Sequence, residues 1–384
     1  QQKISSLTFF NMKNAYKFDV YEGKSGLLSI QTAWEKLYAK SIHQSFYNDW
    51  RWHFALLNNG LVDNVIYLML KAGATAIAII PLQNRRDSKQ GKKMPYRVLG
   101  FPKHSHIVLS DIVIDPDHAS PRTLQTLLHH MQHMPYFSWQ RLEFLFPERS
   151  NAASLFQGQG LKRIACNKNA YFDCSTEAAL KDHVSAKMLR NINRLKNKAE
   201  KELPDLSVRE ISAADEIEDA VEKFLQTEAS GWKGENNSAI LKSRNITSFY
   251  KELASLFAAN NQLRINLLQS GDNVVAAQFC IVTGETFHIL KIGYNEDFKK
   301  LGAGNILLKD LLQKRTVDKN IREVNLVTSP LWAKRWHPRQ DLVYMAYGYR
   351  KNLPGKLLQS IFKFGGLEDR LIEHYKNTIK NIRN

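Results

Sequence analysis

The chain has 384 residues, which is enough for two domains of ordinary size, each with its own core. Its composition, 43% hydrophobic and 24% charged, is that of a folded globular protein and excludes a disordered chain. Three scattered cysteines are too few for a disulfide framework or a cysteine zinc site. The net charge of +17 favours an anionic partner: a nucleic acid, an anionic membrane face or a phosphate-rich cofactor. A solvated basic surface without any partner is the alternative.

The first half of the chain begins with two helix-like segments followed by a long apolar run. Residues 30–41 and 46–59 carry apolar side chains at helical spacing, and the second segment is rich in aromatic residues. The run at residues 65–82 has about the length of a membrane span. However, Lys71 and Gly73 divide this run, so we predict a β-hairpin rather than a transmembrane helix. The first ten residues lack the pattern of a secretory signal. The few, scattered cysteines fit a reducing, cytoplasmic setting.

Turn and cap signals divide the rest of the first half. Ser120 precedes Pro121, a pair typical of a helix start, and predicts a helix over residues 120–134. His129 and His133 would share one face of that helix, but no third ligand stands nearby, so no metal site is expected. The other expected elements are strands at 97–101, 108–114, 141–147 and 168–174 and a short helix at 150–160.

A long basic segment separates the two halves. Residues 181–204 have helical periodicity, many lysines and arginines, and a closing proline, and we interpret them as a linker helix. The second half repeats the order of the first without a residue-by-residue repeat. Its expected elements are strands at 206–211, 262–269, 273–283, 286–294 and 323–328 and helices at 216–229, 247–260 and 303–314. The expected organisation is a first domain at 1–175, the linker at 176–205, a second domain at 206–350 and a basic helical segment at 351–384.

A glycine-rich turn joins a strand to a helix in the second half. Its sequence is KKLGAG, residues 299–304. The start of a helix leaves backbone N–H groups without partners, and these groups bind anions with help from the helix dipole. Gly302 and Gly304 would let a pyrophosphate approach the backbone closely. The alternative is an ordinary turn in which the glycines only satisfy backbone geometry.

The glycine-rich turn and the strands before it resemble those of the GNAT acyltransferases. The phosphate loop of that family reads Gln/Arg-x-x-Gly-x-Gly/Ala, and here Lys299 stands at its first position. More specifically, the chain resembles the CelD/BioF-like branch, whose architecture is similar to that of the Fem-type aminoacyltransferases. The matching segments are AWEKLYAKSIHQSFYNDWRWHFA, AIAIIPLQ, SAKMLRNINRLKNKAEKE, FLQTEASGWKGENNSAI, VVAAQFCIVTGETFHILKIGYNEDFKKLGAGNILL and LWAKRWHP.

The resemblance implies an α+β fold of two tandem GNAT-like domains joined by the basic linker helix. Each domain would have a mixed, mostly antiparallel sheet flanked by helices. The first domain has no glycine-rich loop and is expected to lack a cofactor. The second would bind acyl-CoA as co-substrate, without a metal. The expected cofactor-binding residues are Lys291, Ile292, Gly293, Lys299, Lys300, Leu301, Gly302, Ala303, Gly304 and Asn305.

The resemblance also suggests candidates for catalysis and for acceptor binding. Direct transfer needs a base near the acceptor amine and a group that polarises the thioester carbonyl. The candidate catalytic residues are Glu228, His288 and Tyr294, and the candidate acceptor-binding residues are Trp232, Lys233, Lys334 and Trp336. Each has a structural alternative, such as a packed histidine or an aromatic anchor. Asn325 stands where the family usually has an acidic residue, so no acidic catalytic role is expected there.

The leading functional hypothesis is therefore an acyl-CoA-dependent N-acyltransferase, with O-acyl transfer as a variant. Its acceptor would be a cell-surface glycan, lipid or small-molecule precursor, as in polysaccharide biosynthesis. The first alternative is a Fem-type transferase that uses aminoacyl-tRNA on a peptidoglycan precursor, which the net charge of +17 favours. The second alternative is a non-catalytic GNAT-like binding protein. Peripheral association with an anionic membrane surface at its inner face is compatible with all three.

Overall fold

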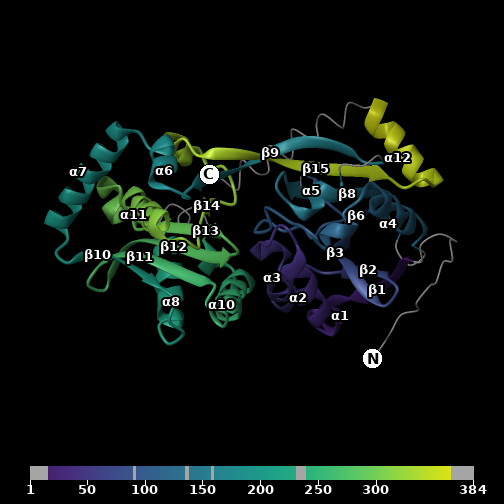
Figure 1. Cartoon of the computed structure of the whole chain (residues 1–384), viewed down its shortest axis with the longest axis horizontal. Helices are drawn as coiled ribbons and strands as arrows, with labels where there is room; N and C mark the ends of the chain where they lie inside the picture. The colour runs from purple at the N-terminus through teal and green to yellow at the C-terminus, as the bar shows by residue number, and fades with distance from the viewer. Residues whose placement is uncertain (1–15, 90–91, 135–137, 157–159, 231–238, 365–384) are drawn as a thin grey trace. The chain divides into compact units, whose positions relative to one another are not determined.

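The structure is a computed structural model that describes residues 16–89, 92–134, 138–156, 160–230 and 239–364. The chain forms two compact units, one of residues 1–168 with 341–384 and one of residues 169–340 (Figure 1). The sequence had suggested domains that are continuous in the chain. The difference arises because the last strand, β15 (Arg339–Tyr349), pairs along its length with β8 (Arg141–Pro147) of the first unit. Backbone pairing therefore joins these segments although about 200 residues of chain lie between them.

The first unit is built on a mixed sheet. Its hydrogen-bonded order is β1-β2-β3-β6-β8-β15, and β7 also pairs with β3. The other strands are β1 (Tyr16–Glu22), β2 (Val65–Ala72), β3 (Thr75–Arg85), β6 (Val98–Gly100) and β7 (Val113–Ile114), and β4 (Ser88–Lys89) pairs with β5 (Lys92–Lys93). The helices are α1 (Gly23–Ser29), α2 (Gln31–Lys40), α3 (Trp50–Asn58), α4 (Pro121–His133) and α5 (Asn151–Leu155). The expected hairpin is confirmed as β2 and β3, which pair antiparallel.

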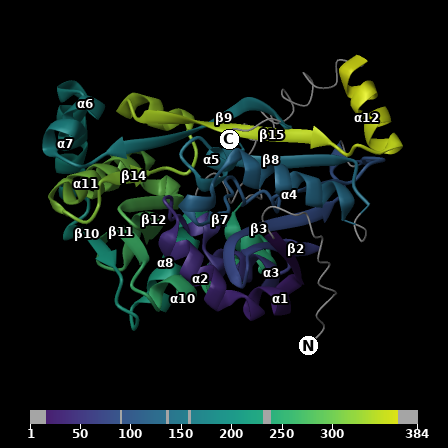
Figure 2. The ribbon, with the colours of Figure 1, turned by 45° about the vertical axis from the view of Figure 1, so that its right-hand side comes forward.

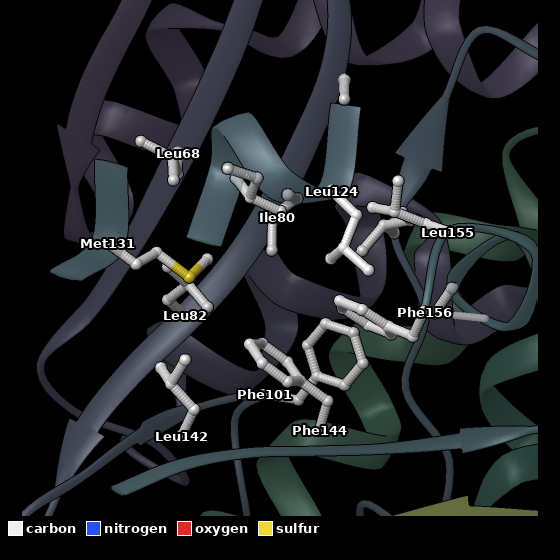
Figure 3. Packing of buried hydrophobic residues seen from close by; sticks show 14 of the residues in the cluster. Leu68, Ile80, Leu82, Phe101, Leu124, Met131, Leu142, Phe144, Leu155 and Phe156 are labelled. Carbon is white, nitrogen blue, oxygen red and sulfur yellow. The ribbon is translucent and has the colours of Figure 1, made fainter. Parts of the chain in front are cut away.

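The core of the first unit lies between this sheet and α4 and α5. Figure 3 shows Phe101, Phe144 and Phe156 packed together beneath Ile80 and Leu124. The ring centroids of Phe144 and Phe156 are 4.7 Å apart, and those of Phe101 and Phe144 are 5.2 Å apart. Ser120 begins α4 as expected, since its side chain accepts a hydrogen bond from the backbone N–H of Thr123.

The second unit is built on a sheet with the order β9-β14-β13-β12-β11-β10. The strands are β9 (Lys162–Asp173), which enters from the first unit, β10 (Leu206–Ile211), β11 (Leu263–Ser270), β12 (Asn273–Thr283), β13 (Thr286–Tyr294) and β14 (Glu323–Asn325). All neighbours pair antiparallel except β13 and β14, which are parallel. A parallel neighbour requires a crossover, and here the crossover contains α11 (Ala303–Val317).

Helices cover both faces of the second sheet (Figure 2). On one face α8 (Ile217–Ala229) and α10 (Arg244–Ala258) pack their aromatic residues against Phe279 of β12. On the other face α11 covers the sheet, and α6 (Glu177–His183) and α7 (Ala186–Glu202) pack against α11. The α+β fold class, with mixed, mostly antiparallel sheets flanked by helices, is thus confirmed.

Three expectations about elements need correction. The basic segment at residues 181–204 is two helices, α6 and α7, because Ser185 leaves the helical conformation and caps α7 through the N–H of Met188. The strand expected at residues 108–114 contains only β7 at its end. The strand expected at residues 323–328 stops at Asn325, where the chain turns.

No helix among the described residues has the length and apolarity to cross a bilayer.

Candidate active site

The strands β13 and β14 separate after a short paired stretch. They pair only from Thr286 to His288, whereas β13 continues to pair with β12 as far as Tyr294. Phe279 of β12 faces Lys291 but the next residue, Cys280, faces Ile289, so Leu290 is a β-bulge. Beyond the split β13 is half-buried. The sheet therefore opens next to residues 289–294, which include residues 291–293, where a backbone donor is expected to polarise the acyl carbonyl.

The ladder with β12 fixes which backbone groups face the opening. The N–H of Asn295 donates to the carbonyl of Val275 at 2.9 Å, which makes them a hydrogen-bonded pair. Because such pairs alternate along an antiparallel ladder, the peptide groups of Ile292 and Tyr294 face away from β12. Both peptide groups lie on the edge of β13 that faces away from β12, beyond the point where β14 stops pairing with β13.

A tight turn after β14 accounts for the split. The N–H of Thr328 donates to the carbonyl of Leu326 across Val327, whose φ is +61°. A β-branched residue in this region is strained. The side chain of Asn325 supports the turn by accepting a hydrogen bond from the N–H of Val327 at 2.7 Å. Asn325 thus has a structural role at the position where an acidic residue is usual.

The glycine turn forms the N-terminus of α11, at the end of a short 3-10 helix (Glu296–Leu301). Gly302 is the N-cap residue and has φ +64°, which favours glycine. The N–H groups of Gly302 and Asn305 donate within the turn, to Lys299 and to Gly302 respectively. In the described part of the chain, no backbone oxygen accepts from Ala303 or Gly304. These two N–H groups are therefore the donors that an anion would meet.

The two glycines of the turn have different surroundings. A Cβ on Gly302 would lie 2.8 Å from Cδ1 of Leu195, which belongs to α7. A Cβ on Gly304 would have no described heavy atom within 4 Å. The fold itself therefore does not require a glycine at position 304. The open space beside its backbone is of the kind that a phosphate group would occupy.

Lysines and a tryptophan flank the turn. Lys299 and Lys300 are both exposed, and the ammonium of Lys299 lies 3.8 Å from the Glu296 carboxylate. Trp336 ends the 3-10 helix Leu331–Trp336 and is only 1% exposed. Its indole donates to Oδ1 of Asn305 at 3.1 Å. Trp336, expected to bind the acceptor, is therefore placed in the core behind the turn, where it has no surface for a substrate.

Glu228 lies directly against the opened strand. A Cβ on Gly293 would come within 2.6 Å of the Cα of Glu228, so the helix α8 touches the backbone of β13 at this glycine. The Glu228 side chain is 2% exposed and its Oε2 accepts a hydrogen bond from the N–H of Ile240 at 2.9 Å. The structure thus brings this candidate base to the segment 291–294, as the acyl-transfer hypothesis needs.

The other two catalytic candidates lie on β13 itself. His288 is buried at the closed end of the split, and its Nε2 is 2.9 Å from the hydroxyl of Thr283. This is the environment of a packed strand histidine. Tyr294 is half-buried at the far end of the strand. Burial, and then its hydrogen bond to Glu296, raise the pKa of the Tyr294 phenol above its usual value of 10.

Of the remaining acceptor candidates, the structure describes only Lys334. Trp232 and Lys233 lie outside the described residues. Lys334 is exposed on the 3-10 helix that ends at Trp336.

Sequence reasoning did not identify Leu195 or Val327, because their roles depend on contacts and a backbone angle that no local pattern reveals.

A basic face runs along α7. Its residues share one side of the helix: Arg190, Asn193, Arg194, Asn197, Lys198 and Lys201. The helix also contacts the turn through Leu195 and contacts α11 through a hydrogen bond from Lys309 to Asn193. The positive face of α7 and the turn thus belong to one packed assembly.

Comparisons with known proteins agree with this geometry. Residues 186–335 match the family model of an acetyltransferase (GNAT) domain. None of the curated proteins matches the chain in sequence. Among solved structures, FemX has a TM-score of 0.58 at 9% identity, covering 86% of this chain and 98% of its own. L-PGS from Bacillus licheniformis has a TM-score of 0.52 at 14% identity, covering 85% and 94%.

A third structure is the C-terminal domain of a putative lysylphosphatidylglycerol synthetase from Agrobacterium fabrum. Its TM-score is 0.52 at 12% identity, and the match covers 88% of this chain and 98% of that one. At such identities these likenesses concern the fold, which extends over both units. The split strand and the glycine turn both lie inside the matched family region. Residues 186–335 therefore form a domain of the GNAT acetyltransferase family, and the chain is an acyltransferase.

Proposed function

We propose that the protein is an acyl-CoA-dependent N-acyltransferase that transfers the acyl group directly to an amine. The acceptor would be a cell-surface glycan, lipid or small-molecule precursor, and a hydroxyl acceptor would suit the same chemistry. The observation that carries the proposal is Gly304. Its open side and the N–H groups at the start of α11 stand directly after a strand that has separated from its neighbour. A pyrophosphate fits the N–H groups and the open space at Gly304, and an extended acyl-pantetheine arm fits the separated edge of the strand.

The donor site combines backbone and lysine groups. The N–H groups of Ala303 and Gly304 would hold the pyrophosphate, and Lys299 and Lys300 would add positive charge. The pantetheine arm would follow the opened edge of β13 past residues 291–293. A backbone N–H on that edge would polarise the thioester carbonyl, a role for which a fixed, partly buried donor is well suited.

The transfer step requires a base for the acceptor amine and an acid for the departing thiolate. The acceptor nitrogen forms a bond to the carbonyl carbon, the carbon–sulfur bond breaks, and the nitrogen loses one proton. Glu228 is our proposed proton acceptor because its helix contacts Gly293 of the opened strand. Tyr294 is our proposed donor of a proton to the departing thiolate, since it lies half-buried at the end of the opened strand and its phenol, with a pKa above 10, is protonated at neutral pH. His288 is then a structural residue that holds the closed end of the split.

Thermal stabilisation by ligands tests the proposal. A ligand at a hundred times its Kd stabilises the native protein by about 2.7 kcal/mol. Acetyl-CoA or a longer acyl-CoA should raise the unfolding midpoint of the wild-type chain, and Gly304→Val should lose this shift. Asn245→Val is the matched control, because Asn245 is an exposed residue at the same second position of α10. Absence of a shift with every CoA, or a shift that survives Gly304→Val, would refute the donor site.

A second candidate function is transfer from aminoacyl-tRNA. The basic face of α7 favours it, because arginine and lysine side chains in a row suit a phosphate backbone. The fold is shared with FemX and with the C-terminal domain of a putative lysylphosphatidylglycerol synthetase, whose name refers to a lysyl group. Under this function tRNA, rather than a CoA, would stabilise the chain at moderate salt. Arg190→Ala with Arg194→Ala would remove that effect and leave any CoA shift intact.

A further inference from the structure

The helix α12 (Leu353–Phe364) follows β15 at the end of the described chain, where Figure 1 draws it in yellow. Its inner face is firmly packed: Leu358 and Phe362 are buried against Tyr96 and Val98 of the first unit. The Arg141 guanidinium lies 5.3 Å from the centre of the Phe362 ring.

The start of the helix is also fixed. The side chain of Asn352 accepts a hydrogen bond from the N–H of Gly355, and a Cβ on Gly355 would clash with the carbonyl of Arg350. The direction of α12 on the first unit is therefore set by its contacts.

The outer face of α12 is apolar as well. Leu353, Leu357 and Ile361 are 81%, 61% and 49% exposed. Four-residue spacing places them in one row along the helix, which we call the outer stripe. Isolated exposed leucines are ordinary, but a continuous apolar row on a helix already packed through its other face indicates an interaction surface.

Positive charge accompanies the outer stripe. The sequence LPGKLLQSIFKF contains Lys356 and Lys363 and no acidic residue. At 100° per residue, both lysines fall on the same side of the stripe. This arrangement of an apolar row beside a basic row is that of a helix lying in the interface of an anionic membrane.

We propose that α12 docks the protein on an anionic lipid surface through the outer stripe and these two lysines. Twelve residues are too few to span a bilayer, so the helix would lie in the plane of the interface. The overall charge of +17 complements anionic headgroups. A second copy of α12 packed antiparallel on the stripe would instead bring lysines against lysines. Residues 365–384 carry four Lys or Arg and three Asp or Glu, so their net charge is positive and does not match the lysines.

Co-flotation of the full chain with vesicles tests this docking. The wild type should bind vesicles of phosphatidylcholine mixed with phosphatidylglycerol, and bind phosphatidylcholine alone much more weakly. Replacing Leu353, Leu357 and Ile361 together by Ser should lower partitioning by about tenfold or more. Changing Lys356 and Lys363 to Gln should lower it by about fivefold per lysine and reduce its dependence on salt.

Matched controls come from other exposed apolar residues of the first unit. Leu28 and Ile42 are 44% and 67% exposed, and their replacement by Ser should leave vesicle binding unchanged. If the triple variant is poorly folded, Leu353→Ser alone serves, since this side chain is almost fully exposed.

Three results would overturn the proposal. The first is equal binding of the wild type and the triple variant. The second is equal binding to neutral and anionic vesicles. The third is a larger oligomeric mass for the wild type than for the triple variant without lipid, because a second copy would then cover the stripe. None of these measurements involves CoA, so the outcome is independent of the donor site.

Discussion

The indole Nε1 of Trp336 donates a hydrogen bond to Oδ1 of Asn305 across 3.1 Å. This bond ties a buried side chain of one 3-10 helix to the first turn of α11, whose N–H groups form the proposed phosphate cradle. In the proposed function, Trp336 would therefore support the donor site through Asn305 rather than contact the acceptor.

Replacing Trp336 by Phe should weaken donor binding while keeping most of the packing. A lost hydrogen bond of this kind costs about 1 kcal/mol, and Asn305 in the first turn of α11 would lose the contact that holds it in place. We expect a severalfold rise in KM for acyl-CoA with a smaller change in kcat. Steady-state kinetics measures the two parameters separately. Trp332→Phe, at the partly exposed tryptophan of the same 3-10 helix, is the control, and an equal effect there would argue against the positioning role.

The two glycines of the turn should respond in opposite ways to alanine. Gly304→Ala adds a methyl group to open space within a helix, so the free energy of unfolding should rise by about 0.5–1 kcal/mol. The same methyl group would obstruct the phosphate and weaken CoA binding. Gly302→Ala should lower stability by about 1 kcal/mol, because Gly302 has φ +64° and faces Leu195. Denaturant unfolding with and without CoA separates these effects.

Gly293→Ala should damage both stability and activity. Its Cβ would lie 2.6 Å from the Cα of Glu228, so α8 would have to move off the opened strand. Overpacking of this kind costs about 1–3 kcal/mol. The measurement is unfolding together with turnover. An alanine variant with unchanged stability and activity would show that α8 is not held against β13 as described.

Glu228→Gln tests the proposed base. The amide oxygen of Gln can still accept the hydrogen bond from Ile240, so the fold should be retained. Loss of a general base typically lowers kcat by about 10²–10⁴-fold. Activity that recovers with rising pH in the variant, as the acceptor amine deprotonates by itself, is the expected signature. A merely structural glutamate would instead give a lower unfolding midpoint and an unchanged pH profile.

Acid should destabilise the first unit through one buried and one half-buried histidine, His53 and His130. Burial lowers the pKa of His53 from 6.5 to about 3 and, together with the charges of His129 and His133, that of His130 to about 4. The native state keeps both rings neutral while the unfolded chain takes up protons below pH 6.5. Stability is thus lost as the pH falls from 6.5 toward these values, by about 2 kcal/mol per histidine at pH 5.

His130→Leu should reduce this loss and can be followed by thermal unfolding at pH 7 and pH 5. His130 stacks on Phe18 with ring centroids 3.9 Å apart, a contact that an apolar side chain can replace. His129→Leu on the exposed side of α4 is the control. An unchanged pH dependence in His130→Leu would assign the acid sensitivity to other groups.

Much of the local structure was determined by the sequence alone. Alternating and helical periodicities predicted the hairpin of β2 and β3, the meander of β11 to β13 and the helix α11. The turn KKLGAG was recognisable because glycine and lysine at the start of a helix favour the binding of an anion. Such sequence signals are local, so they predict a structure without knowledge of which residues pack against it.

Tertiary structure alone decided how these pieces combine. The pairing of β15 with β8, the end of the β13–β14 pairing at His288 and the contact between Gly293 and Glu228 all join residues far apart in the chain. It also separated two glycines that look equivalent in the sequence, since Gly302 faces Leu195 while Gly304 faces open space. The reason is physical: a local pattern fixes backbone preference, but which atoms surround a residue depends on non-local packing.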